Sequence, residues 1–270
     1  MNRIPLIDSV THPTLDGSWL KPGQRDFTAE RLLGEMEEHG VSAAVCVGML
    51  GVGGYEPRRY AQALAPHKGR LIPVAFFDFE RVSSEDDVDR YLRALKADSY
   101  RGIKIHPRFS RITLEHPLMR AVIVRAGALG LAPLLCTYFQ DRGGDNSKNN
   151  MASLRRLLEA TAGARTMLVH GGTVNVLEMM EIVRPYPELL LDLSLTLCKY
   201  EGSSVDLDLA YLFKNFDRRI CVGSDYPEYD LGKFRARFEH FAKGLPREKA
   251  ENIASKNIAA FLGLEADDAA

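Results

Sequence analysis

The sequence predicts an α/β protein in which eight parallel strands and their helices form a single (β/α)₈ TIM barrel. Short apolar runs alternate with amphipathic helical segments along almost all of the 270 residues. The runs are apolar at nearly every position, which is typical of parallel strands covered on both faces. No shift in composition indicates a second domain. A closed barrel therefore suits this number of units, in a chain of this length, better than an open doubly wound sheet.

Eight apolar runs are predicted as the strands of this barrel. Each is short, as strands are, and each is followed by a segment with helical periodicity. The predicted strands span residues 4–8, 43–47, 71–77, 102–106, 132–136, 166–170, 189–193 and 220–223. Because parallel strands need a crossover connection, this strict alternation predicts that the helices cover the outside of the sheet.

The predicted helices carry recognisable end signals. Thr28 can cap the first helix at its N-terminus, and Gly40 can end it in a left-handed conformation. The helices are predicted at residues 28–39, 57–65, 84–97, 117–129, 151–162, 174–183, 206–214 and 231–242, with an additional C-terminal helix at 247–262. Residues 1–264 are therefore expected to form one barrel domain, followed by a frayed tail at 265–270.

Composition and charge exclude several classes of function. The formal net charge is −1 with 26% charged residues, so we expect neither a nucleic acid nor a membrane surface as partner. No apolar stretch approaches the roughly 20 residues of a spanning helix, and the N-terminal residues lack a signal-like apolar run. The four cysteines are widely spaced and form no CxxC pair. A cytoplasmic protein with a small-molecule substrate is the resulting expectation.

Polar side chains end most of the predicted strands. In barrels of this kind the active site lies at the carboxyl ends of the strands. The residues at or just after these ends are Asp8, His12, Asp78, Lys104, His106, Cys136, His170, Asp192, Ser194 and Asp225. One such residue alone is often structural, but several that converge on one mouth indicate a functional site.

The alternation of side chains along a strand shows which residues face the barrel interior. Lys104 and His106 share one face of their strand, whereas Ile103 and Ile105 share the other. Placing a lysine between the sheet and its helices would be costly, so Lys104 and His106 are predicted to point into the mouth. The same argument places Asp192 inward, where it could contact the substrate.

Loops at the same end of the barrel supply further candidates for substrate binding. Arg108 and Arg142 could hold a carboxylate, and Tyr138 begins the polar loop that contains Arg142. Trp19, the single tryptophan, follows the first strand and is expected to pack over the mouth. The glycine-rich segment 48–55 lacks the spacing of a phosphate-binding loop and is predicted to form an apolar wall.

Four segments resemble the amidohydrolase superfamily, specifically the amidohydrolase-related group that contains aminocarboxymuconate-semialdehyde decarboxylase and 2-pyrone-4,6-dicarboxylate lactonase. They are Ile7-Asp8-Ser9-Val10-Thr11-His12, Gly102-Ile103-Lys104-Ile105-His106-Pro107, Leu168-Val169-His170-Gly171-Gly172 and Val222-Gly223-Ser224-Asp225-Tyr226-Pro227. In this family a His-x-His pair, a strand-five histidine and a strand-eight aspartate hold a divalent metal, often zinc. The resemblance assigns His12 to the second histidine of the pair, His170 to a strand-six histidine that assists catalysis, and Asp225 to the strand-eight aspartate.

The sequence departs from the family pattern at two ligand positions. Val10 stands at the first histidine of the pair and Cys136 at the strand-five histidine. Valine cannot bind a metal, but cysteine can, so a zinc site of His12, Cys136 and Asp225 is chemically possible. Because two of the four usual ligands are lost, a degenerate site without a tight metal is the favoured alternative.

Without a metal, acidic and basic side chains of the protein would have to catalyse the reaction. The leading hypothesis is hydrolysis of a C–N or ester/lactone bond in a small carboxylate-bearing or cyclic substrate, and the resemblance to the lactonases allows a metal-free route. Asp225 would act as base, with its pKa raised by burial, while His170 would shuttle a proton and Lys104 and His106 would polarise the substrate. Lys104 could also form a Schiff base, although pairing with Asp78 or Asp192 is the more usual role of a lysine.

Two alternatives to hydrolysis remain open from the sequence. The first is a non-oxidative decarboxylase that uses the same mouth, with Lys104, Arg108 or Arg142 holding the acid. The second is a catalytically silent barrel that binds a metabolite or serves as a partner subunit. The resemblance also implies a possible homodimer, because barrels of this group often pair.

Overall fold

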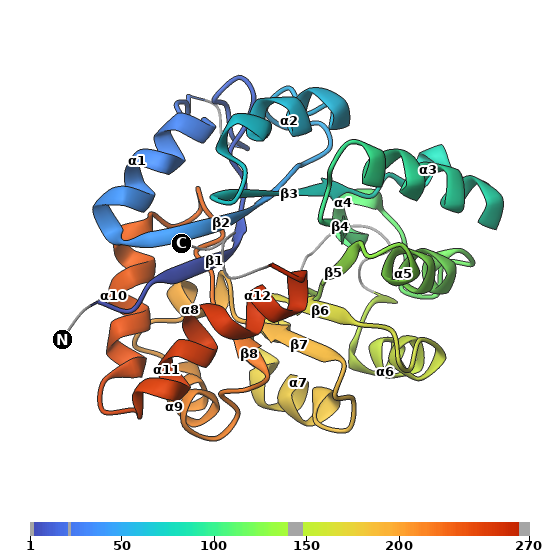
Figure 1. Cartoon of the computed structure of the whole chain (residues 1–270). Helices are drawn as coiled ribbons and strands as arrows, with labels where there is room; N and C mark the ends of the chain where they lie inside the picture. The colour runs from blue at the N-terminus through green and yellow to red at the C-terminus, as the bar shows by residue number, and fades with distance from the viewer. Residues whose placement is uncertain (1–2, 21–22, 140–147, 265–270) are drawn as a thin grey trace.

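The computed structural model describes residues 3–20, 23–139 and 148–264 and confirms the barrel. Eight parallel strands follow one another in chain order around a ring, with the helices outside (Figure 1). The strands are β1 (Leu6–Thr11), β2 (Val41–Val47), β3 (Leu71–Phe76), β4 (Gly102–Ile105), β5 (Ala132–Cys136), β6 (Thr166–Val169), β7 (Leu189–Asp192) and β8 (Ile220–Cys221). Backbone hydrogen bonds join the last strand region to the first, from Ser9 N to Val222 O (3.1 Å) and from Asp225 N to Val10 O (3.0 Å).

The helices lie where the sequence predicts them, with shifts of a few residues at their ends. Long helices are α1 (Ala29–His39), α2 (Pro57–Leu64), α3 (Glu85–Ala97), α5 (Met119–Ala128), α6 (Met151–Ala160), α7 (Val176–Val183), α9 (Val205–Asn215) and α10 (Leu231–Ala242). Thr28 caps α1 by accepting a bond from Arg31 N, and Gly40 ends it with a φ of 67°. The short helices α4 (Pro107–Ser110) and α8 (Thr196–Lys199) and the 3₁₀ segments η1 (Ala65–His67), η2 (Phe79–Arg81) and η4 (His170–Asn175) complete the connections.

The C-terminal helical run closes the N-terminal end of the barrel. It consists of α11 (Arg247–Glu251), the π-helical segment η5 (Asn252–Lys256) and α12 (Asn257–Leu262). In Figure 1, α12 crosses the end of the ring of strands. Its Ile258 and Phe261 join the apolar cluster inside the barrel. This end is therefore filled, and the opposite end remains for a site. None of the helices in the described ranges is long and apolar enough to cross a membrane.

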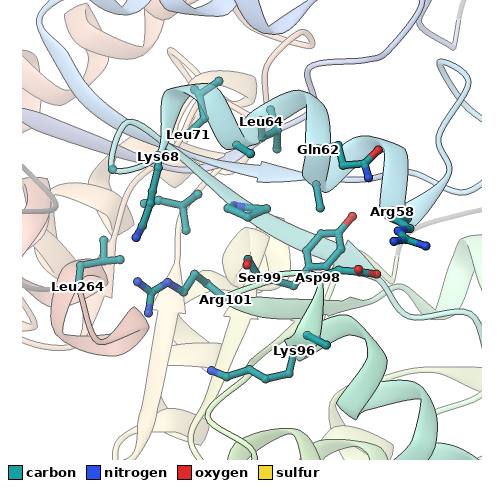
Figure 2. A pocket seen from close by; sticks show the side chains of 17 residues that line it. Arg58, Gln62, Leu64, Lys68, Leu71, Lys96, Asp98, Ser99, Arg101 and Leu264 are labelled. Atoms are coloured by element: carbon teal, nitrogen blue, oxygen red, sulfur yellow. The ribbon is translucent and has the colours of Figure 1, made fainter.

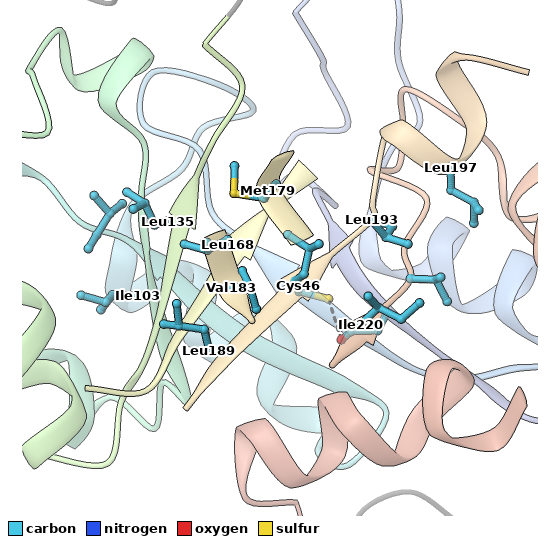
Figure 3. Close-up of a cluster of buried hydrophobic side chains, with 14 of the residues drawn as sticks. Cys46, Ile103, Leu135, Leu168, Met179, Val183, Leu189, Leu193, Leu197 and Ile220 are labelled. Atoms are coloured by element: carbon cyan, nitrogen blue, oxygen red, sulfur yellow. Dashed lines mark hydrogen bonds between the residues drawn. The ribbon is translucent and has the colours of Figure 1, made fainter. Parts of the chain in front are cut away.

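The side chains of the strands separate into the two layers that their alternation predicts. Ile103 and Ile105 belong to the layer between strands and helices, and Figure 3 shows part of that layer, with Leu168 of β6 near Met179 of α7. The interior layer contains alternate residues of the strands, such as Leu134 of β5. Lys104, which shares the inward face of β4, therefore points toward the interior and the mouth.

The first strand differs from its prediction. The sequence places it at residues 4–8, ending at the first charged side chain, whereas β1 extends to Thr11. Asp8, Ser9 and Thr11 are fully buried within it and find hydrogen-bond partners on β2, on β7 and in the segment after β8. Polar side chains can occupy a buried strand when residues distant in the sequence supply their hydrogen-bond partners. A prediction that ends the strand at its first charged residue then makes the strand too short.

Candidate active site

A cavity of about 200 Å³ lies at the carboxyl ends of the strands, where the sequence predicts the site. Eight predicted site residues line it: His12, Trp19, Lys104, His106, Arg108, Tyr138, His170 and Asp225. Leu20, Met49, Phe109, Leu195, Lys199 and Glu228 line it as well. The cavity is smaller than a typical drug-sized pocket, which suits a small substrate.

Strand β4 and the residue that follows it bring two buried nitrogen atoms to the cavity, and neither has a hydrogen-bond partner in the described chain. Lys104 is 1% exposed, and its Nζ has no hydrogen-bond partner among the residues that the structure describes. Burial lowers the pKa of Lys104, despite the opposing charges of Cys136 and Asp225. His106 is 4% exposed, and its Nδ1 likewise finds no partner within the described chain. Burial also lowers the pKa of His106, which favours its neutral form.

Asp225 lies beside His12 in the cavity lining. It follows β8 with a positive φ of 60°, and its Oδ1 lies 3.4 Å from His12 Nε2. The carbonyl of Val47 can only accept, so His12 Nδ1 donates to it at 2.9 Å and Nε2 is left to face Asp225. Burial alone would raise the pKa of Asp225, but His170, His12 and Lys104 hold it well below its ordinary value. Our prediction that burial raises this pKa is wrong, because the sequence does not show that three basic side chains surround the carboxylate.

His170 reaches the cavity through an unusual backbone conformation. It has a positive φ of 71° directly after β6. Its Nδ1 lies 3.1 Å from Ser194 Oγ and 3.2 Å from the carbonyl of Ser194, and the side chain also interacts with Asp225 and Cys136. Burial opposes the charged form of His170, but Asp225 and Cys136 outweigh it and raise the pKa.

Cys136 lies between the two histidines beneath the cavity floor. Its side chain is buried and interacts with the side chains of His106 and His170. Burial would raise the pKa of this thiol, but the two imidazoles outweigh burial and hold it well below its ordinary value. Cys136 is therefore in contact with ionisable groups and does not serve only as an apolar filler.

Asp192 belongs to the support of the site and does not line the cavity. It accepts hydrogen bonds from the Ser9 and Ser194 hydroxyls, from Ser194 N at 3.1 Å and from His170 N at 3.2 Å. A carboxylate has about four acceptor positions, so none remains for the substrate contact that we predicted. Asp78 caps η2 and pairs with Arg81 at 3.2 Å. Neither acid is therefore hydrogen-bonded to Lys104.

Aromatic and cationic groups form the rim. Trp19 stacks on His12 with ring centroids 5.4 Å apart and donates from Nε1 to Glu228 at 2.9 Å, which confirms its expected place over the mouth. Tyr138 lies between two cations: the guanidinium of Arg108 is 5.1 Å from its ring centroid and Lys199 Nζ is 4.7 Å from it. Arg142, the other predicted carboxylate-binding residue, lies outside the described residues.

Lys199 and Glu228 are the charged cavity residues that the sequence analysis missed. Both lie in connections at the carboxyl ends of strands. Arg108 was predicted because it lies in such a connection, and the same criterion could have identified Lys199 and Glu228. Leu195 was missed as well, and it reaches the cavity in a loop where its φ is 61°. No local pattern of residue types predicts such a conformation at a leucine.

The donors present do not fit the divalent metal of the resembled group. Val10, at the missing histidine position, is fully buried in the apolar interior. Within the described ranges, no three His, Cys, Asp or Glu side chains are grouped so that they could hold a metal ion. The hypothesis of a zinc site at His12, Cys136 and Asp225 therefore has no support from this geometry.

A second cavity, of about 550 Å³, lies toward the other end of the barrel. Residues of α2, the start of β3, the segment between α3 and β4, and Leu264 line it (Figure 2). Its lysines, Lys68 and Lys96, are exposed at the surface. In TIM barrels chemistry takes place at the carboxyl ends of the strands, so the smaller cavity is the candidate active site.

Comparisons with known proteins agree with this fold. Residues 20–264 match the sequence model of a family described as Amidohydrolase, a range that begins after Val10 and His12. A search of curated proteins finds no match.

Several solved structures are similar over nearly the whole chain. An uncharacterized TIM-barrel protein from Bordetella bronchiseptica has a TM-score of 0.79 and 16% identity, covering 96% of this chain and 99% of its own. The 5-carboxyvanillate decarboxylase of Sphingomonas paucimobilis has a TM-score of 0.68 and 15% identity, covering 97% and 100%. A dihydroorotase from Campylobacter jejuni has a TM-score of 0.63 and 16% identity, covering 97% and 84%. At these identities the likeness establishes the shared fold.

Proposed function

This chain belongs to the amidohydrolase family, and on that premise we propose that it is an enzyme that decarboxylates a small carboxylic acid at the mouth of the barrel. The observation that carries the proposal is the charge of the cavity. Lys104, Arg108, Lys199 and three histidines line it, against Asp225 and Glu228. Such an excess of basic groups favours an anionic substrate.

Arg108 and Lys199 are the groups that suit the binding of a carboxylate. They lie against the ring of Tyr138, which contacts both cations. A guanidinium offers two parallel donors to a carboxylate, and a nearby ammonium adds charge. Trp19, Leu20 and Phe109 bring apolar surface to the same cavity, which lowers the local dielectric and strengthens these interactions.

The depressed pKa of Asp225 favours decarboxylation over hydrolysis. A hydrolase without a metal needs a base whose pKa lies near the working pH in order to activate water. Asp225 remains ionised but is a weak base, because His170, His12 and Lys104 lower its pKa. Decarboxylation needs no activated water; it needs a place for an electron pair and a proton for the carbon, which His170 in its protonated form could deliver.

Hydrolysis of a C–N or ester/lactone bond remains the second candidate because of His170. Its pKa is raised from the ordinary value of 6.5, and its side chain lines the cavity. A histidine in this position could serve as the base for a water molecule, with Lys104 stabilising the oxyanion. The Campylobacter dihydroorotase shares the fold, which is compatible with this candidate.

The proposal is tested by measuring product release from two substrate panels. One panel contains aromatic and keto carboxylic acids, assayed for CO₂. The other contains small esters, lactones and cyclic amides, assayed for ring opening or acid release. CO₂ release that Arg108→Met reduces at least about tenfold, with Arg111→Met as an exterior control, would support decarboxylation. Turnover of the second panel alone would favour the hydrolase, and binding without turnover in either panel would favour the silent barrel.

Metal removal gives an independent prediction. We expect CO₂ release to remain within about twofold after dialysis against a chelator, because the donor set does not fit a metal. Elemental analysis is expected to find far less than one zinc per chain, both in the wild type and in Cys136→Ala. Stoichiometric zinc that is lost in Cys136→Ala and Asp225→Asn, together with its activity, would contradict this prediction.

A further inference from the structure

Lys104 presents a buried amine to the cavity, and we infer that this amine forms a covalent imine with the ketone of a β-keto acid. The inference rests on the proposed decarboxylation and names its substrate class. It is carried by three observations: the amine is enclosed, it lacks a hydrogen-bond partner in the described chain, and it lines a cavity that also contains groups able to bind a carboxylate.

The position of Lys104 has no evident structural need for an amine. On neighbouring strands its register partners are Phe76 of β3 and Leu134 of β5, both apolar and buried. An apolar side chain could fill this place without desolvating a nitrogen. An unpaired buried polar group destabilises the fold, and an unpaired buried ion destabilises it more. The amine is therefore more readily explained by a role in chemistry than by packing.

The surroundings of Lys104 favour an amine that can act as a nucleophile. Burial lowers its pKa, and Arg108 lowers it further, while Cys136, Asp225 and Asp192 oppose this change. A lysine nucleophile must lose its proton, and desolvation beside another cation is a recognised way to achieve this. Asp78 and Asp192, the acids that the sequence suggests as ion-pair partners of Lys104, are hydrogen-bonded to other donors. Asp225 acts on Lys104 through its charge but forms no hydrogen bond with its Nζ in the described chain.

The reaction balances with groups already in the cavity. Lys104 Nζ attacks the ketone carbon, forming a C–N bond as the C=O π electrons move to oxygen. That oxygen gains one proton from the attacking nitrogen and one from His170 and leaves as water, which produces the protonated imine. The C–C bond to the β-carboxylate then breaks, CO₂ leaves and its electron pair moves to the imine nitrogen. The resulting enamine takes a proton at carbon, and water from solvent releases the ketone and restores Lys104.

This electron flow selects the substrate class. Only a carboxylate attached to the carbon next to the ketone can pass its electron pair to the imine nitrogen in one step. An aromatic acid without a ketone cannot form the imine. The cavity of about 200 Å³ also favours a small keto acid.

The test uses the full chain with acetoacetate as probe and sodium borohydride as trap. Borohydride reduces an imine to a stable secondary amine, so intact mass and peptide mapping are expected to show one adduct on Lys104. Two variants divide the possible roles of the side chain: Lys104→Arg retains a cation but cannot form this imine, and Lys104→Met removes the charge. Lys243→Arg is the matched control, because it alters an exposed lysine outside the cavity and keeps its charge.

The expected result is an adduct in the wild type and in Lys243→Arg, and none in Lys104→Arg or Lys104→Met. CO₂ release from acetoacetate is expected to fall at least about a thousandfold in both Lys104 variants, the scale of loss when a covalent nucleophile is removed. Circular dichroism of each variant shows whether it folds. 3-Hydroxybutyrate, which lacks the ketone, is expected to leave no adduct.

Separate outcomes overturn the inference and the proposed function. CO₂ release from the acid panel without any trapped adduct, or with activity retained in Lys104→Arg, would overturn the imine while leaving decarboxylation in place. An adduct at Lys104 without CO₂ release from any acid would support the imine and overturn decarboxylation. An adduct that persists in Lys104→Arg would place the reactive amine elsewhere and overturn the inference.

Discussion

Two layers of buried polar groups lie near the carboxyl end of the barrel, and they differ in how they are satisfied. In the lower layer, Asp8 and Asp192 accept hydrogen bonds from Ser224 and from Ser9 and Ser194. In the upper layer, Lys104 Nζ and His106 Nδ1 have no partner in the described part of the chain. The hydrogen-bonded groups of the lower layer hold the strand ends together. The unpaired groups of the upper layer are also buried, and they remain available to a ligand.

Glycine at position 223 makes the lower layer possible. A Cβ there would lie 2.6 Å from Ser9 Oγ and 2.8 Å from Asp8 Oδ1. Both distances are shorter than real contacts allow, so a side chain would displace the carboxylate or the hydroxyl. The lower layer thus depends on close packing as well as on hydrogen bonds, and the upper layer rests on it through His170 and Ser194.

The largest effect is expected when an upper-layer group is replaced by an apolar one. Lys104→Met should abolish CO₂ release, yet raise the free energy of unfolding by about 1–3 kcal/mol because a buried unpaired nitrogen is removed. Urea unfolding measures the free energy of unfolding. Lys199→Met, which makes the same substitution at an exposed lysine, is the control. A stability loss of similar size would mean that Lys104 belongs with the structural groups.

The opposite behaviour is expected of the lower layer. Asp192→Ala removes the acceptor for Ser9, Ser194 and the His170 amide and should lower the free energy of unfolding by about 5 kcal/mol, since several buried donors lose their partner. Denaturant titration measures it, and Asp192→Asn should lose less because one oxygen remains. Wild-type stability in Asp192→Ala would contradict the comparison.

The pH dependence of stability offers a third test. Burial raises the pKa of Asp8 from 3.8 to about 7, with Asp192 adding to the shift and the bonds from Ser224 and Val10 opposing it. The folded state therefore holds a proton that the unfolded state releases, so the contribution is full below pH 4 and is lost as pH rises to about 7. At 1.36 kcal/mol per pKa unit the loss is about 4 kcal/mol.

Asp8→Asn isolates this contribution. The variant should lose the decline in stability between pH 4 and 7, whereas Glu80→Gln, an exposed carboxylate variant, should retain it. Unfolding curves in urea at several pH values measure the slope. An unchanged slope in Asp8→Asn would mean that Asp8 is ionised in the folded protein.

The smallest effect is expected from packing. Gly223→Ala should lower the free energy of unfolding by about 2 kcal/mol, within the range for overpacking a buried site. Gly127→Ala, where nothing lies within 4 Å of an added Cβ, serves as the control and should be neutral or stabilising. Equal stability of both variants would show that the lower layer can adjust to a side chain.

Local pattern was sufficient for much of the fold. The helix ends at Thr28 and Gly40, and the facing of Lys104 away from Ile103 and Ile105, follow from capping preference and from the alternation of side chains. Capping and side-chain alternation depend on a few consecutive residues, so they can be predicted from a single sequence. The extension of β1 to Thr11 could not be predicted this way, because its polar residues are stabilised by strands distant in the sequence.

The sequence by itself determined that this protein is a barrel and that His12, Lys104, His106, His170 and Asp225 meet at its mouth, because strand ends and residue parity are local properties. Only the tertiary structure decided what each group does there. It placed basic side chains around Asp225, which reversed the expected shift of its pKa, and it committed Asp192 to inner hydrogen bonds. Within the described residues, it also left Lys104 Nζ near Asp225 but without a hydrogen bond to it or to any other acid. Pairing and charge state depend on distances between side chains from different strands, and the order of residues in one strand does not contain those distances.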